Sequence, residues 1–177
     1  MKRLLSIALV GILLIGVFLS GCVGSTEDPK NEEIARAMSS VANGKGVIDA
    51  SAYTKSKGLH PVVIITSSGE IDSWNSEIPQ EWQPKLIGET QLVAVITKGA
   101  NSLQTCAYTG PSVTRYQCYV KADLREAKTG NLVKSTTLYG SVPVQCRQRE
   151  RMSVTALYGS SVEFSQLKDW LQGYVMS

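Results

Sequence analysis

The chain has 177 residues with 18 Lys and Arg against 15 Asp and Glu, one His and four Cys. Without residues 1–21, which carry two of the cations and none of the anions, the balance is 16 against 15. Because this leaves no basic excess to neutralise a phosphate lattice, the composition argues against nucleic acid as a partner. The remaining length suits one domain with a single core.

A secretory signal is predicted at the amino terminus. Lys2 and Arg3 precede an apolar run over residues 4–19, and Leu19-Ser20-Gly21-Cys22 follows. The order is typical of a signal peptide, and the tetrapeptide resembles a prokaryotic lipobox, in which the Cys receives a lipid on its sulfur. The resemblance implies that residues 1–21 are a lipoprotein signal peptide and that lipid on Cys22 holds the protein at the outer face of the cell membrane. An uncleaved helical anchor is the alternative, although the apolar run is shorter than the ~20 residues of a membrane span.

The mature chain is expected to start with a flexible tether and to continue as one extracytoplasmic domain. Residues 22–30 are short, polar and turn-rich, which is typical of a tether, so the domain is placed at 31–177. Apolar residues at helical spacing predict an amphipathic helix from Asn31 to Ala42. After a loop, Val62 to Thr66 reads as a buried strand.

An irregular segment with two tryptophans follows that strand. Residues 69–85 contain Trp74 and Trp82 and two prolines, and such a segment is expected to lie across one end of the sheet, held there by its aromatic side chains. If the two indoles are exposed, they form a candidate binding surface.

The next part of the chain predicts strands joined by tight turns, and a helix ends the chain. The expected strands are 92–97, 103–108, 113–127, 132–140 and 153–158. The final helix is expected over 162–175, with Ser161 or Ser165 as its N-cap. The fold class is therefore α+β: an antiparallel sheet of about five to six strands with an amino-terminal and a carboxyl-terminal helix packed on one face.

Three of the four cysteines lie among these strands. In an oxidising compartment they predict one disulfide and one leftover thiol. A hairpin centred near residues 111–112 would place Cys106 opposite Cys118, within reach of a disulfide. Pairing of Cys106 with Cys146 is the alternative.

A series of short motifs resembles an uncharacterised extracytoplasmic domain of prokaryotic membrane proteins and lipoproteins. In order, the motifs are His60-Pro61, Pro79-x-x-Trp82, Leu92-Val93, Cys106-x-Tyr108, Ala127-x-Thr129-Gly130, Gly140-x-x-Pro143-x-x-Cys146 and Trp170-Leu171. The resemblance covers about residues 58–175 and implies no known activity. It implies that Cys106 pairs with Cys146 and leaves Cys118 free.

Chemistry-bearing residues are few. Arg147, Arg149 and Arg151 form one local charge cluster, which suits either an anion site or, because Gln and Glu alternate with the arginines, an exposed loop. The single His60 precedes a proline, no Gly-x-Ser-x-Gly elbow occurs, and no Cys pair has metal-ligand spacing. We therefore expect no metal, no cofactor and no obvious enzyme site.

Two functions from different classes fit these observations. The first is a protein-binding or envelope-assembly module that contacts another envelope protein through its sheet or through the tryptophan segment. The second is a small-molecule sensor or carrier with a pocket of about 300 Å³ or more between the terminal helices and the sheet, near the arginine cluster. Hydrolysis through His60 is a third, weaker hypothesis.

Overall fold

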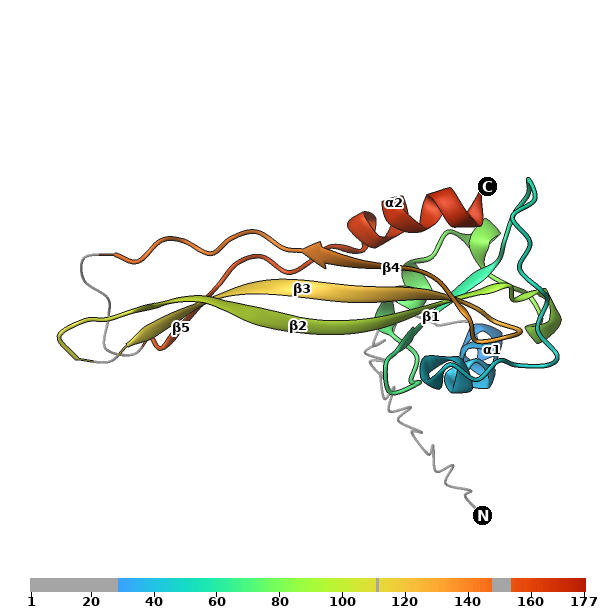
Figure 1. Ribbon diagram of the computed structural model, residues 1–177, viewed down its shortest axis with the longest axis horizontal. Helices are drawn as coiled ribbons and strands as arrows, with labels where there is room; N and C mark the ends of the chain where they lie inside the picture. The colour runs from blue at the N-terminus through green and yellow to red at the C-terminus, as the bar shows by residue number, and fades with distance from the viewer. Residues whose placement is uncertain (1–28, 111, 148–153) are drawn as a thin grey trace, which may run out of the picture.

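The computed structural model describes residues 29–110, 112–147 and 154–177, so the predictions for Cys22, Arg149 and Arg151 lie outside the described residues. The elements are α1 (Pro29–Ala37), β1 (Val62–Thr66), β2 (Leu92–Cys106), β3 (Val113–Glu126), β4 (Leu132–Tyr139), β5 (Ala156–Tyr158) and α2 (Phe164–Val175), with short 3₁₀ helices η1 (Ser39–Asn43), η2 (Ser73–Glu77), η3 (Gln80–Trp82) and η4 (Ile87–Glu89). Figure 1 shows an elongated molecule in which β2 and β3 project far beyond both helices. We name the projecting part, residues 97–121, 139–147 and 154–160, the arm, and the rest of the described chain the head.

The sheet is mixed. Its strand order is β1-β2-β3-β4, and β5 also pairs with β3. The β2–β3 and β3–β4 pairs are antiparallel, whereas β1–β2 and β3–β5 are parallel. The α+β class is confirmed, and the expectation of a purely antiparallel sheet is wrong. The reason is that residues 67–91 form a long connection, which returns the chain to the end of the sheet where β1 began.

Two of the expected strands form a single strand, β2. Residues 98–101, expected as a turn, pair in unbroken register with residues 117–120 of β3. The register shifts once, between Ser102 and Gln104, and the hairpin closes with Cys106 opposite Val113. Lys98-Gly99 is therefore part of the ladder, because fourteen-residue β3 offers hydrogen-bond partners along the whole length of β2.

Each face of the head sheet carries its own core. Leu167, Leu171 and Val175 of α2 pack on the face formed by Ile64, Ala94, Leu124 and their neighbours. Ile34 and Met38 of the α1 region pack on the opposite face, against Val63, Ile65, Val93 and Val95. The expectation that both helices share one face is wrong, because β1 and the first part of β2 are apolar at successive positions, and successive side chains point to opposite faces.

The helix ends differ slightly from expectation. The α1 helix begins at Pro29 and passes into the 3₁₀ helix η1, which Gly44 ends with a φ of 74°. The α2 helix is capped by Glu163 and Gln166 in a reciprocal capping box rather than by Ser161 or Ser165. Within the described residues no helix combines the length and the apolar content that a membrane span requires.

The strands β4 and β5 pair with different parts of the same edge of β3, and the chain segments that follow them cross. The β4 strand pairs with residues 119–125 and β5 with residues 114–116. Where they cross, Gly140 N–H donates to Cys118 O and Gly159 N–H donates to Tyr116 O. Ser141 and Ser160 each accept at the side-chain oxygen from the other's backbone N–H, at 2.8 and 3.0 Å. Beyond the crossing, residues 141–147 run along the arm (Figure 1), where Cys146 forms a disulfide with Cys106.

Candidate functional site

The two tryptophans of the candidate binding surface belong to the core. Trp74 is 9% and Trp82 2% exposed, and both lie in the cluster beneath α2. The Trp74 ring lies 6.0 Å from that of Phe164, and Lys98 Nζ lies 4.2 Å from the Trp74 ring centroid. The segment packs on the sheet as expected, and its two indoles fill the space between the sheet and α2 rather than forming an exposed aromatic surface.

His60 connects the loop at Ser56 to Gln91, just before β2. It is 3% exposed, with Nδ1 2.8 Å from Gln91 Oε1 and Nε2 3.0 Å from the Ser56 carbonyl oxygen. The Tyr53 ring meets the imidazole edge-on at 5.0 Å. Since both ring nitrogens have partners in the fold, the geometry gives no support to His60 as a hydrolytic base.

The distal end of the arm contains the disulfide. Cys106 is bonded to Cys146, with 5.8 Å between the Cα atoms, and Cys118 is a half-buried free thiol. Hairpin pairing of Cys106 with Cys118 does not occur, because the register places Ala100 opposite Cys118. Arg147 lies one residue after the disulfide and is exposed.

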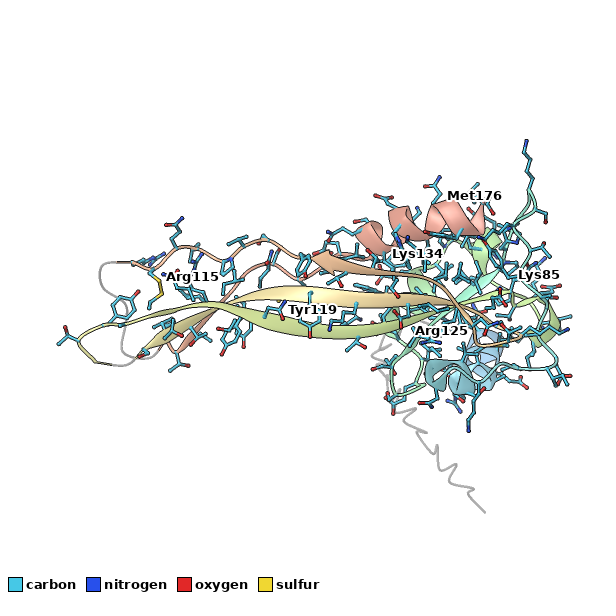
Figure 2. The ribbon with its side chains drawn as sticks, viewed as in Figure 1. Lys85, Arg115, Tyr119, Arg125, Lys134 and Met176 are labelled. Atoms are coloured by element: carbon cyan, nitrogen blue, oxygen red, sulfur yellow. A yellow bond between two sulfur atoms is a disulfide. The ribbon has the colours of Figure 1, made fainter. Side chains whose placement is uncertain are left out.

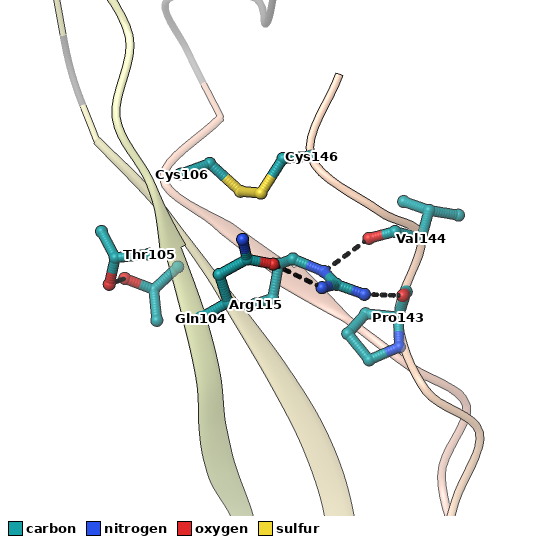
Figure 3. The surroundings of a disulfide bond; sticks show 8 residues. Gln104, Thr105, Cys106, Arg115, Pro143, Val144 and Cys146 are labelled. Atoms are coloured by element: carbon teal, nitrogen blue, oxygen red, sulfur yellow. Dashed lines mark hydrogen bonds between the residues drawn. A yellow bond between two sulfur atoms is a disulfide. The ribbon is translucent and has the colours of Figure 1, made fainter. Parts of the chain in front are cut away.

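Beside the disulfide, a buried arginine ties the returning chain to the hairpin (Figure 3). Arg115 is 8% exposed and donates to Val144 O at 2.8 Å, to Pro143 O at 2.6 Å and to Gln104 Oε1 at 2.7 Å. With the Cys106–Cys146 bond, these contacts fix residues 143–146 over one face of the hairpin. One disulfide and the Arg115 hydrogen bonds therefore attach the returning chain to the hairpin.

The principal candidate site is an unpaired strand edge on this arm. β1 pairs with β2 only from Leu92 to Ile96. Beyond Ile96, nothing in the described chain pairs with β2 on the side away from β3. We name residues 97–105 on that side the open edge of β2. Every residue of the open edge is exposed or partly exposed.

The direction of the backbone groups on the open edge follows from β1. Leu92 N–H donates to Pro61 O, and Ile96 O accepts from Ser67 N–H. Because the N–H and C=O of one strand residue point to the same side and the side alternates along the strand, Lys98, Ala100 and Ser102 direct theirs away from β3. The sequence did not indicate this site, because a turn was expected at residues 98–101.

Two hollows lie on the head of the described chain. One of about 440 Å³ lies between the first turn of α1 and residues 85–88, and one of about 420 Å³ lies beside residues 57–59 and 176–177. Neither includes Arg147, and both are open to solvent. In the described part of the chain, no group of three or more His, Cys, Asp or Glu side chains could hold a metal ion.

Comparison of the chain with protein-family models, with curated proteins and with solved structures gives no match.

Proposed function

We propose that this protein is a lipid-anchored extracytoplasmic module that binds an extended segment of another envelope protein along the open edge of β2. Signal-like residues 1–21 and the lipobox ending at Cys22 support the anchor and the location. The Cys106–Cys146 disulfide supports an oxidising compartment.

The single observation that carries the binding function is the open edge itself. Backbone N–H and C=O groups that point out of a sheet edge pair with another extended backbone. The β1 strand ends beside Ile96, and the register shift follows Ser102, so the regular part of the edge is bounded at 97–102. This length suits one short added strand.

The usual protection of an edge is weak here. Exposed edges are commonly guarded by charged side chains, especially Lys, or by proline. Residues 97–105 contain no proline and one charged residue, Lys98. The Lys98 ammonium lies 2.9 Å from Asp72 and over the Trp74 ring, so its charge is already paired with the head.

The arm is also ordered before it binds. The disulfide and the Arg115 contacts hold the hairpin tip, and the paired strand β3 supports β2 from behind. Pre-ordering lowers the entropy lost on binding. A ligand-carrier function has less support, because the two hollows described above are open to solvent.

The test exploits the outward direction of the Ala100 N–H. Ala100→Pro removes a donor that the fold does not use, and proline is tolerated on an edge strand whose N–H faces solvent. We expect a photo-crosslinker at position 101 of the full-length protein, in its native membranes, to lose its crosslinked partner in this variant. The matched control Ala100→Val keeps the N–H and retains crosslinking. Equal yields in both variants, with equal free energies of unfolding, would exclude binding through this edge.

Anchoring is tested separately on the same material. We expect the intact mass to show that the chain begins at Cys22 and carries lipid, and we expect Cys22→Ser to release the protein from washed membranes. Retention of Cys22→Ser in the membrane with residues 1–21 still present would favour the uncleaved anchor instead.

A further inference from the structure

A tyrosine crosses β2 towards the open edge, on the face of the sheet opposite to α2. Tyr119 pairs with Gly99, and a Cβ at Gly99 would lie 2.6 Å from both Cζ and Oη of Tyr119. The phenol therefore occupies the space above Gly99, with its hydroxyl group over β2. Figure 2 places Tyr119 midway along the projecting strands, well away from Arg125 in the head.

A lysine accompanies this tyrosine on the same face. Lys121 is two residues from Tyr119 in β3, and its Nζ lies 5.6 Å from the Tyr119 ring centroid. It is exposed, and within the described residues it has no ion pair. The nearest acid in sequence, Asp123, lies 3.5 Å from Arg125 and accepts from Ser135 Oγ at 2.7 Å. Lys121 and the Tyr119 hydroxyl group thus form a donor pair beside the edge.

The charge distribution of the chain sets the arm apart from the head. The sequence has no Asp or Glu between Thr97 and Ala122, and between Thr136 and Val162 the only acid is Glu150, which lies outside the described residues. The arm has four cationic side chains, Lys98, Arg115, Lys121 and Arg147. Asp72 and backbone oxygens already bind Lys98 and Arg115. Arg147 follows the disulfide at the distal end of the arm, so the cation available to a strand added beside Gly99 is Lys121.

We infer that the segment bound at the open edge is acidic and places an Asp or Glu carboxylate against Lys121 Nζ and Tyr119 Oη. This inference rests on the proposed strand addition and names the chemistry of its partner. On an added strand, every second side chain points to the face that carries Tyr119. A carboxylate there is complementary to the described part of the arm, which contains no acidic residue, whereas a lysine would face the like charge of Lys121.

The experiment uses three eight-residue peptides and the full-length protein in phosphatidylcholine nanodiscs. The peptides alternate Thr with Glu, Gln or Lys, so that the second residue type faces Tyr119 in any register with the correct parity. Binding is measured by fluorescence anisotropy. We expect the Glu peptide to bind about threefold to tenfold more tightly than the Gln peptide, the range for a partly exposed charged hydrogen bond, and the Lys peptide to bind most weakly.

Two variants locate the effect. Lys121→Gln is expected to abolish the preference for the Glu peptide over the Gln peptide. The matched control Lys134→Gln removes an exposed charge from β4 and should leave the preference intact. Equal affinities for the Glu and Gln peptides, persistence of the preference in Lys121→Gln, or binding of none of the peptides up to 1 mM would overturn the inference. Loss of crosslinking in Ala100→Pro would still support strand addition in each of these cases.

Discussion

At the scale of single residues, Arg115 has the most unusual environment in the arm. Its guanidinium is buried without a carboxylate, and its charge is stabilised by two backbone carbonyls and the Gln104 amide oxygen. These oxygens are in turn satisfied by Arg115. Truncation of Arg115 would leave these buried oxygens without hydrogen-bond donors. The free energy of unfolding then falls by more than the net contribution of the hydrogen bonds themselves.

Arg115→Ala is accordingly expected to lower the free energy of unfolding by about 2–4 kcal/mol, from lost hydrogen bonds and the cavity left behind. Urea unfolding of the detergent-solubilised protein measures the change. The control Lys134→Ala, at an exposed position of β4, should stay within about 0.5 kcal/mol of the parent. A loss for Arg115→Ala no greater than that of the control would show that the arginine does not hold residues 143 and 144.

At the scale of elements, the crossing of β4 and β5 depends on two glycines. A Cβ at Gly140 would lie 1.9 Å from Ser160 O, and a Cβ at Gly159 would lie 1.7 Å from Ser141 O. The obstacles are backbone atoms, which cannot rotate away. The two segments that meet here have similar sequences, Thr-Thr-Leu-Tyr-Gly-Ser at 136–141 and Thr-Ala-Leu-Tyr-Gly-Ser at 155–160. Each segment stops pairing with β3 at its Tyr-Gly-Ser.

We expect Gly159→Ala to cost about 3 kcal/mol or more, the upper range for overpacking, because the two chains must separate. Gly173→Ala is the matched control: it lies in α2 with open space around the added methyl group and should stabilise by about 0.5–1 kcal/mol. Thermal unfolding followed by circular dichroism compares the two. A Gly159→Ala protein with the stability of the parent would contradict the close crossing.

At the scale of the whole molecule, the head and the arm are stabilised by different means. The head has two apolar clusters, one on each face of the sheet. The arm has few buried apolar side chains and relies on the ladder, on Arg115 and on a disulfide that joins residues 40 apart. A part of this kind is expected to open locally once its constraint is removed.

Cys146→Ser should therefore lower the local stability of the arm more than that of the head. The chain-entropy model gives about 4 kcal/mol for a loop of 40 residues. In hydrogen-exchange mass spectrometry, we expect peptides from residues 97–121 to lose protection while those from β1 and α2 keep it. Equal loss of protection in both parts would indicate that the molecule unfolds as one unit.

The candidate site shows where sequence patterns mislead. Trp74 and Trp82 were expected as surface candidates because large aromatics in an irregular segment are ambiguous, and only the packing of α2 over them makes them core residues. The open edge was missed because Lys98-Gly99-Ala100-Asn101 resembles a turn. Gly99 continues the strand because Tyr119 from β3 fills the space that a side chain would take. In both cases the deciding contact comes from a distant part of the chain: α2 for the two tryptophans, and Tyr119 for Gly99.

By itself the sequence determined the α+β class, the position of β1, most of β3 and β4, and the final helix, because these depend on local apolar periodicity and on turn residues. It also pointed, through resemblance, to the Cys106–Cys146 bond. Only the tertiary structure decided the parallel pairs, the separation of the helices onto opposite faces, the crossing of β4 and β5, and the open edge of β2. Each of these depends on which distant segment lies beside a strand, and a strand's own residues do not encode its neighbour.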